Sequence, residues 1–89
     1  MKELKNNQMP LIDVRTVEEF AQGHLPGAIN IPLDQIDQAE IAAQSRLYCR
    51  SGRRSELAKR KLQERGIATV NLGGIEDYDG PIEHDIEFF

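Results

Sequence analysis

One stretch decides the fold of this chain, and it is Arg46-Leu47-Tyr48-Cys49-Arg50-Ser51-Gly52-Arg53-Arg54-Ser55. Its first four residues are predicted to form a short strand. Gly52 lies in a turn that leads into a helix, which Gly66 would end. In an open α/β sheet, ligands bind at the carboxyl ends of the strands, where such connections lie. The stretch therefore predicts both an α/β fold and a candidate site at Cys49.

The segments on either side of this stretch alternate between strand and helix. Short apolar runs predict strands over residues 11–14, 28–31, 46–49 and 68–72. Between them lie a short helix that begins after Thr16, one or two helical turns within 33–44, and a longer helix that follows Ser55 and runs to Arg65. This alternation indicates a mostly parallel small sheet flanked by helices. A chain of 89 residues has room for one core, so we expect a single domain over 1–89.

Thr16 and Glu19 form the pattern of a capping box at the start of the first predicted helix. The Thr16 hydroxyl would accept a hydrogen bond from the Glu19 amide, and the Glu19 carboxylate would accept one from the Thr16 amide. Arg15 precedes this turn, and we expect it to pair with Glu18 or Glu19 rather than with a ligand. Asp13 is expected to anchor a loop by hydrogen bonds rather than to act as an acid or a base.

The remaining chemically distinctive residues are given structural roles. His24 lies between a helix end and a Pro-Gly turn, and we expect it to support the fold. His84 lies in the acidic C-terminal segment, where we expect it to be solvated. Phe88 and Phe89 would cover an apolar patch of this chain or of a neighbouring subunit, and the sequence does not decide between these two roles.

Composition and charge exclude several classes of function. The chain is 39% apolar and 29% charged, as in ordinary globular proteins. Its net charge of −4 argues against binding nucleic acid through a basic surface. No apolar run approaches the roughly 18 residues of a membrane span. Residues 1–7 are polar and show no signal peptide, so we expect a cytoplasmic protein; a periplasmic location is the alternative if a leader peptide has been removed.

Cys49 is the single cysteine, so the chain can form neither an internal disulfide nor a cysteine-based metal site. A lone cysteine is usually a small buried apolar residue. However, Arg50, Arg53 and Arg54 surround this one without an evident packing role, and with the helix N-terminus they favour a thiolate. Gly52 permits a turn whose N–H groups converge on an anion. We therefore interpret Cys49 as a nucleophile rather than as a core residue.

Several segments resemble the rhodanese-like family of sulfurtransferases. They occur in the family's order and spacing, and together they are far more specific than any one of them alone. The matching segments are residues 11–15 (LIDVR), 18–20 (EEF), 23–32 (GHLPGAINIP), 48–55 (YCRSGRRS) and 73–76 (GGIE).

The resemblance implies a rhodanese fold and a single-domain thiosulfate sulfurtransferase. In the family's reaction, the cysteine takes sulfane sulfur from thiosulfate, or from another small anionic donor, as a persulfide. It then passes the sulfur to cyanide, to a small thiol or to a protein thiol. No metal or organic cofactor is called for. The residues that this resemblance assigns to the anion-binding loop after Cys49 are Arg50, Ser51, Gly52, Arg53 and Arg54.

Within that loop the backbone amides are expected to contribute most to anion binding. The side chains of Arg50 and Arg53 are expected to come next, and Arg54 is expected to turn towards solvent.

Three other functions use comparable folds or residues. A cysteine-dependent phosphatase or arsenate reductase also uses a strand–loop–helix anion site. The loop of those enzymes has a Cys-x5-Arg pattern, whereas this chain has Ser55 at the arginine position. A thioredoxin-like oxidoreductase would need a second cysteine. The non-enzymatic alternative is a sulfur-carrier or regulatory binding module built on the same fold. The presence of Cys49 favours the enzyme without excluding that module.

Overall fold

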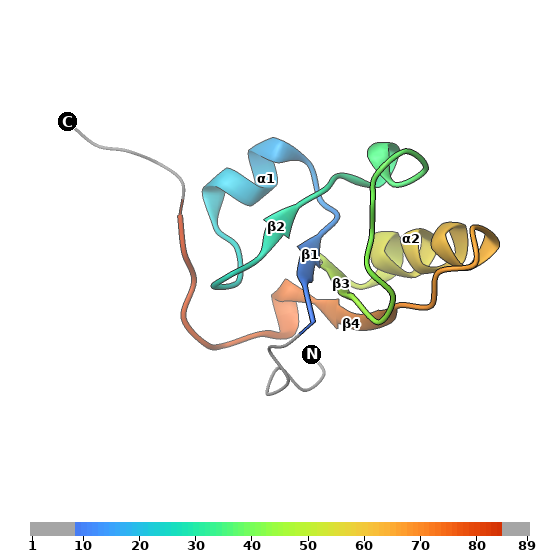
Figure 1. Cartoon of the computed structure of the whole chain (residues 1–89). Coiled ribbons are helices and arrows are strands. Elements are labelled where there is room, and N and C mark those ends of the chain that lie inside the picture. The colour runs from blue at the N-terminus through green and yellow to red at the C-terminus, as the bar shows by residue number, and fades with distance from the viewer. Residues whose placement is uncertain (1–8, 85–89) are drawn as a thin grey trace.

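The described part of the chain, residues 9–84 of a computed structural model, is built around one four-stranded parallel sheet (Figure 1). The strand order is β2-β1-β3-β4, and all three pairings are parallel. The predicted α/β fold with a small parallel sheet is therefore confirmed. The strands are β1 (Leu11–Asp13), β2 (Ile29–Asn30), β3 (Arg46–Cys49) and β4 (Val70–Gly74).

Two α-helices and one short 3-10 helix connect these strands, and a second 3-10 helix follows the last strand. The structure gives them as α1 (Val17–Gln22), η1 (Leu33–Gln35), α2 (Arg53–Glu64) and η2 (Ile75–Asp77). α2 begins before Ser55, earlier than predicted, because Gly52 adopts a left-handed conformation (φ 99°) and serves as its N-cap. The predicted helical turns within 33–44 are reduced to the single turn of η1.

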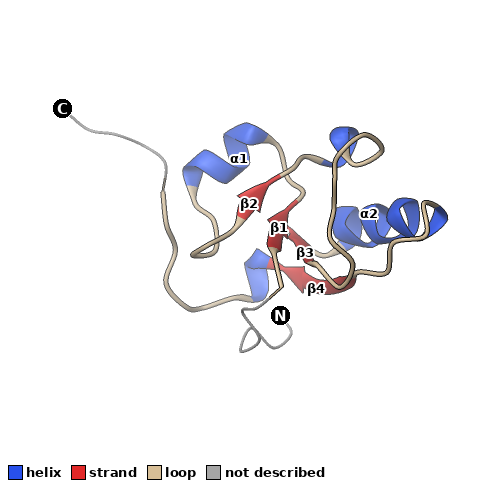
Figure 2. Cartoon of the chain, viewed as in Figure 1, coloured by secondary structure: helices blue, strands red, loops and turns tan. Residues whose placement is uncertain are grey.

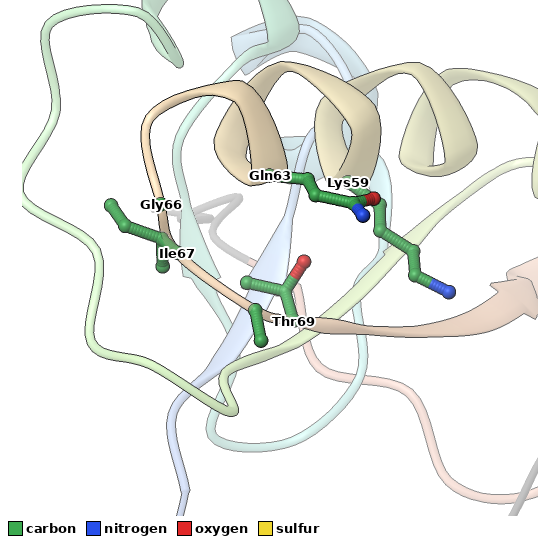
Figure 3. Close-up of a pocket in the computed structure, with 6 residues that line it drawn as sticks. Lys59, Gln63, Gly66, Ile67 and Thr69 are labelled. Carbon is green, nitrogen blue, oxygen red and sulfur yellow. The ribbon is translucent and has the colours of Figure 1, made fainter.

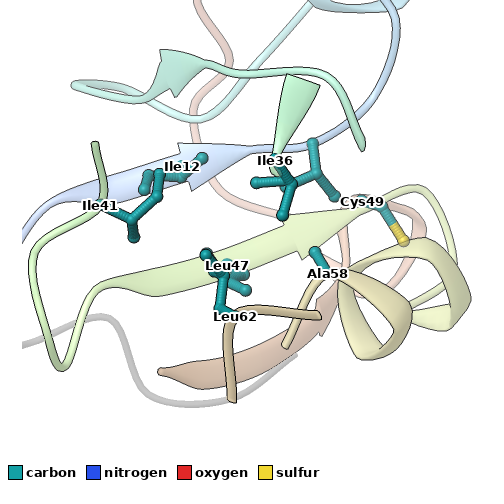
Figure 4. Packing of buried hydrophobic residues seen from close by; sticks show 8 residues of the cluster. Ile12, Ile36, Ile41, Leu47, Cys49, Ala58 and Leu62 are labelled. Carbon is teal, nitrogen blue, oxygen red and sulfur yellow. The ribbon is translucent and has the colours of Figure 1, made fainter. Parts of the chain in front are cut away.

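The sheet buries apolar side chains on both faces, because successive residues of a strand point to opposite sides. In β3, Leu47 and Cys49 face α2, whereas Tyr48 faces the other layer. Figure 4 shows the packing beneath α2, with the Cys49 sulfur directed towards the start of that helix. This larger cluster consists of Ile12, Val14, Ile36, Ile41, Leu47, Cys49, Ala58 and Leu62. The smaller cluster on the opposite face consists of Leu11, Leu25, Tyr48 and Leu72.

The capping box at the start of α1 is confirmed. The Glu19 amide donates to Thr16 Oγ1 at 3.2 Å, and the Thr16 amide donates to Glu19 Oε1 at 3.0 Å. The expected pairing of Arg15 with Glu18 or Glu19 is wrong. Arg15 instead donates to both carboxylate oxygens of Asp13, and its shortest contact there is 2.7 Å.

The reason for this correction is burial. Asp13 and Arg15 are both buried at the end of β1, and two buried opposite charges must satisfy each other. The Arg15 amide also donates to Asp13 Oδ1 at 2.8 Å, so Asp13 is the local anchor that the sequence predicted. Arg15 Nη2 reaches the Gly23 carbonyl at 2.7 Å and thereby joins β1 to the end of α1.

His24 has the structural role expected of it. It is buried and stacks on Phe20 with ring centroids 3.7 Å apart, and its backbone pairs with that of Glu83. The segment before residue 84 is thereby held beside the end of α1. His84 is exposed, as expected, and its Nδ1 lies 2.6 Å from the Gln22 carbonyl oxygen. The prediction for Phe88 and Phe89 lies outside the described residues.

Candidate active site

The loop after β3 brings several hydrogen-bond donors onto the sulfur of Cys49. We call residues 49–55 the Cys49 loop; Figure 2 shows it leading from β3 directly into α2. The Gly52 amide lies 3.0 Å from Cys49 Sγ, the Ser55 amide 3.4 Å, and the Ser55 hydroxyl 3.5 Å. Cys49 itself is only 1% exposed. The sulfur therefore lies at the carboxyl end of β3 and beside the first turn of α2, as the sequence predicted.

These donors determine the ionisation of the thiol. Burial is the largest single influence and raises the pKa of Cys49. Hydrogen bonds from the Ser55 side chain, then from the amides of Ser55, Gly52 and Ser51, together outweigh burial, and the pKa lies below its usual value. Sequence reasoning gave much of this effect to the neighbouring arginines, but the hydrogen bonds of the loop are its main cause. A thiolate is favoured, and the thiolate is the nucleophilic form of cysteine.

The Cys49 loop keeps its shape because β4 ends in two glycines beside it. A Cβ atom on Gly74 would overlap the Arg50 carbonyl and the Cα of Ser51. A Cβ atom on Gly52 would lie 3.3 Å from the Cα of Gly73. Residues 73–74, quoted above only as a matching segment, therefore permit the close backbone contact that fixes the loop.

The three arginines of the loop differ in their surroundings. Arg50 is exposed, and its Nε lies 3.8 Å from Glu76 Oε2. Arg53 is exposed, and no ion pair to it is found among residues 9–84. Arg54 was expected to turn towards solvent, and this expectation is wrong. It donates two hydrogen bonds to the carboxylate of Glu19, at 2.7 and 2.9 Å.

Glu19 is thus a residue of the site that sequence reasoning assigned only to helix capping. Its hydrogen bonds with Arg54 are the largest cause that lowers its pKa, to about 2. Glu19 and Arg54 are 35 residues apart, and no sequence pattern links them. Their pairing joins α1 to the first turn of α2, and it leaves Arg50 and Arg53 as the more available cations of the loop.

Two surface pockets border the Cys49 loop. One, of about 450 Å³, includes Arg15, Glu19 and Arg50 in its lining. The other, of about 540 Å³, includes Arg54 and Lys61. Each pocket therefore presents cationic side chains next to the loop, together with carboxylates that partly offset their charge.

A third pocket, of about 440 Å³, lies at the far end of α2 and at the start of β4 (Figure 3). Because the strands are parallel, this position is at the opposite end of the sheet from Cys49. The Thr69 hydroxyl in its lining is buried and finds no hydrogen-bond partner among the described residues. A water molecule would satisfy it.

Two further findings concern cofactors and membranes. Among residues 9–84, no three His, Cys, Asp or Glu side chains gather where they could hold a metal ion. In the same part of the chain, no helix has both the length and the apolar character needed to cross a membrane.

Comparison with known proteins identifies the family. The model of the rhodanese-like domain matches residues 1–80, and the chain belongs to this family. Its fold is therefore the rhodanese fold, as the resemblance implied, and sulfurtransferase is the function class that the family supports.

Three similar proteins illustrate this relationship. Thiosulfate sulfurtransferase PspE of Escherichia coli is 40% identical over 77 residues, which cover 79% of this chain and 74% of that protein. The putative sulfur carrier protein YrkF of Bacillus subtilis is 33% identical over 84 residues; these cover 88% of this chain but only 45% of the relative. A solved rhodanese from E. coli, described as containing anions, superimposes with a TM-score of 0.76 at 35% identity. The match covers 85% of this chain and 98% of the solved one.

Proposed function

We propose that this chain is a thiosulfate sulfurtransferase that carries sulfane sulfur on Cys49 as a persulfide. The observation that supports this most is the convergence of the Gly52 and Ser55 donors on Cys49 Sγ. Donors in this position stabilise the attacking thiolate, and they lie close to where the outer sulfur of a persulfide would carry negative charge. The similarity to PspE, itself a thiosulfate sulfurtransferase, supports thiosulfate as the donor.

The proposed reaction has two steps, both nucleophilic displacements at sulfur. In the loading step, the Cys49 thiolate attacks the outer sulfur of thiosulfate. A new S–S bond forms, the S–S bond of thiosulfate breaks, and sulfite leaves with the electron pair of that bond. In the unloading step, cyanide or a thiolate attacks the outer sulfur of the persulfide, and the Cys49 thiolate leaves. No separate base is required when the thiol is already ionised.

The loop residues have separate proposed roles in binding the donor. The amides of Ser51 and Gly52 would donate hydrogen bonds to the negatively charged sulfur. Arg50 and Arg53 are exposed and would attract the dianion and bind its sulfonate oxygens. Arg54 is already neutralised by Glu19 and would mainly hold the loop in place.

This arrangement also favours sulfur transfer over phosphate chemistry. A Cys-x5-Arg enzyme would need an arginine where Ser55 lies, and Arg54 is one position early. Glu19 already occupies the Arg54 guanidinium. The loop therefore lacks the arginine with which Cys-x5-Arg enzymes bind the phosphate oxygens.

A second candidate function is a sulfur carrier whose donor and acceptor are both proteins. The similarity to YrkF, described as a putative sulfur carrier protein, is the observation that favours it. In that case the Cys49 persulfide would form, but thiosulfate would be a poor donor.

Intact mass spectrometry of the purified protein tests the proposal. After thiosulfate treatment we expect the mass of one added sulfur atom, and we expect cyanide to remove it. The Cys49→Ser variant is the control, and it should gain nothing. If the wild type gains no sulfur from thiosulfate, the thiosulfate reaction is rejected; loading by a protein persulfide instead would then support the carrier.

A further inference from the structure

Asn71 in β4 is linked to Cys49 through the Ser55 hydroxyl. Ser55 Oγ lies 2.7 Å from Asn71 Oδ1, 3.1 Å from the Gly52 carbonyl oxygen and 3.5 Å from Cys49 Sγ. Ser55 is fully buried. The shortest of these three contacts is therefore with a side chain that does not touch the sulfur.

The orientation of the Asn71 amide is determined by its other neighbours. Its Oδ1 accepts the Gly73 amide at 2.9 Å. Its Nδ2 donates to the Gly52 carbonyl at 3.2 Å and to Glu56 Oε1 at 3.1 Å. Turning the amide over would place an N–H group against the Gly73 donor and an oxygen against two acceptors. The oxygen is therefore the atom that faces Ser55.

A hydroxyl group has one hydrogen to donate, so Ser55 cannot serve its three acceptors at once. Hydrogen bonds to charged acceptors are the stronger ones. A charged Sγ would therefore attract the hydroxyl hydrogen, whereas an uncharged Sγ, which is a weak acceptor at 3.5 Å, would lose it to Asn71 Oδ1.

We propose that Asn71 is a positioning residue whose side-chain oxygen competes with Cys49 Sγ for the single hydrogen of the Ser55 hydroxyl. The hydroxyl turns to Sγ in the thiolate and to Asn71 once Sγ has become neutral. This inference rests on the proposed role of Cys49 as the sulfur-carrying nucleophile.

The competition assists the loading of sulfur. When Cys49 becomes a persulfide, its negative charge moves from Sγ to the outer sulfur. The hydrogen bond from Ser55 that Sγ then loses is replaced by the bond to Asn71 Oδ1. Without Asn71, the hydroxyl would have only the longer contact to the Gly52 carbonyl, at 3.1 Å instead of 2.7 Å, so the balance would move towards the thiolate.

The test measures the pKa of Cys49 from the pH dependence of its alkylation by iodoacetamide, which requires no thiosulfate activity. Asn71→Leu removes the competing oxygen, so Ser55 donates more fully to the thiolate. We expect the pKa of Cys49 to fall by about half a unit, which corresponds to the net free energy of one modest hydrogen bond. The loading equilibrium can be measured from mass spectra at fixed concentrations of thiosulfate and sulfite. In Asn71→Leu the ratio of persulfide to thiolate should be about threefold lower than in the wild type.

Two control variants separate this role from simple structural support. In a Ser55→Ala background, Asn71→Leu should no longer lower the pKa. Thr69→Val, a polar-to-apolar change just before β4, should leave it unchanged. If Asn71 only supports the loop, Asn71→Leu will instead raise the pKa towards that of an ordinary thiol, and the proposal is overturned.

A measurement on the wild type covers the case in which Asn71→Leu does not fold. The Gly73 amide shares Oδ1 with the Ser55 hydroxyl, so its hydrogen bond should strengthen when Ser55 turns away. We expect the NMR signal of the Gly73 amide proton to move with the ionisation of Cys49, and to move much less in Ser55→Ala. Equal movement in both proteins would overturn the competition while leaving the sulfurtransferase proposal intact.

Discussion

The ion pair between Glu19 and Arg54 joins α1 to the first turn of α2, and we expect Glu19→Gln to destabilise the protein. Two hydrogen bonds, of 2.7 and 2.9 Å, connect the two side chains. Arg54 is the largest cause of the lowered pKa of Glu19, which is about 2 instead of 4.5; burial opposes it, and the Thr16 amide adds to it. Glutamine keeps the shape of the side chain but removes its charge.

The magnitude follows from that pKa. A fall of this size corresponds to about 3 kcal/mol of stabilisation by the charged form. The Arg54 and Glu19 side chains are 32% and 30% exposed, so water screens part of the interaction. Glutamine also retains part of the capping box. We therefore expect Glu19→Gln to lower the free energy of unfolding at neutral pH by about 1–2 kcal/mol.

The effect depends on pH in a defined direction. A carboxylate whose pKa is lowered by folding contributes its full stabilisation above its unfolded pKa, and it loses this contribution as the pH falls towards its folded pKa. For Glu19 this window runs from 4.5 down to about 2. We would measure urea unfolding of the wild type and of Glu19→Gln at pH 7, 4 and 3. The difference between their free energies of unfolding should become smaller as the pH falls.

The control for this experiment is Glu18→Gln, which changes the adjacent exposed glutamate of the same helical turn. It should alter stability by a few tenths of a kcal/mol at most. Equal stability of Glu19→Gln and the wild type at pH 7 would refute the reasoning. So would a difference that does not diminish at pH 3.

Three further predictions concern the site and its support. Arg53→Ala should raise the KM for thiosulfate with little change in unfolding free energy, because the side chain is exposed; steady-state kinetics and urea unfolding would check both. Gly74→Ala should displace the loop backbone and return the pKa of Cys49 towards its ordinary value, which the pH dependence of alkylation would show. Tyr48→Phe removes the buried acceptor of the Leu25 amide, 3.0 Å away, and should cost about 1–3 kcal/mol in unfolding free energy.

The sequence by itself determined the features that depend on neighbouring residues. The capping box formed as predicted because Thr16 and Glu19 lie one helical turn apart. Cys49 was placed at a strand–loop–helix connection because a short apolar run, a glycine and a helical pattern follow one another there. The alternation of strands and helices likewise predicted the parallel sheet, since parallel strands require a crossover connection between them.

Tertiary structure alone decided which distant side chains meet at the site. Arg54 pairs with Glu19, and Ser55 meets Asn71, because the strand order brings α1 and β4 to opposite sides of the Cys49 loop. Arg15 pairs with Asp13 because both side chains are buried, and the spacing of the residues in the sequence did not predict that burial. Sequence patterns record periodicity within an element, whereas hydrogen bonds and ion pairs depend on which elements lie side by side. The nucleophile could therefore be predicted from its local surroundings, but the groups that tune it became visible only in the folded chain.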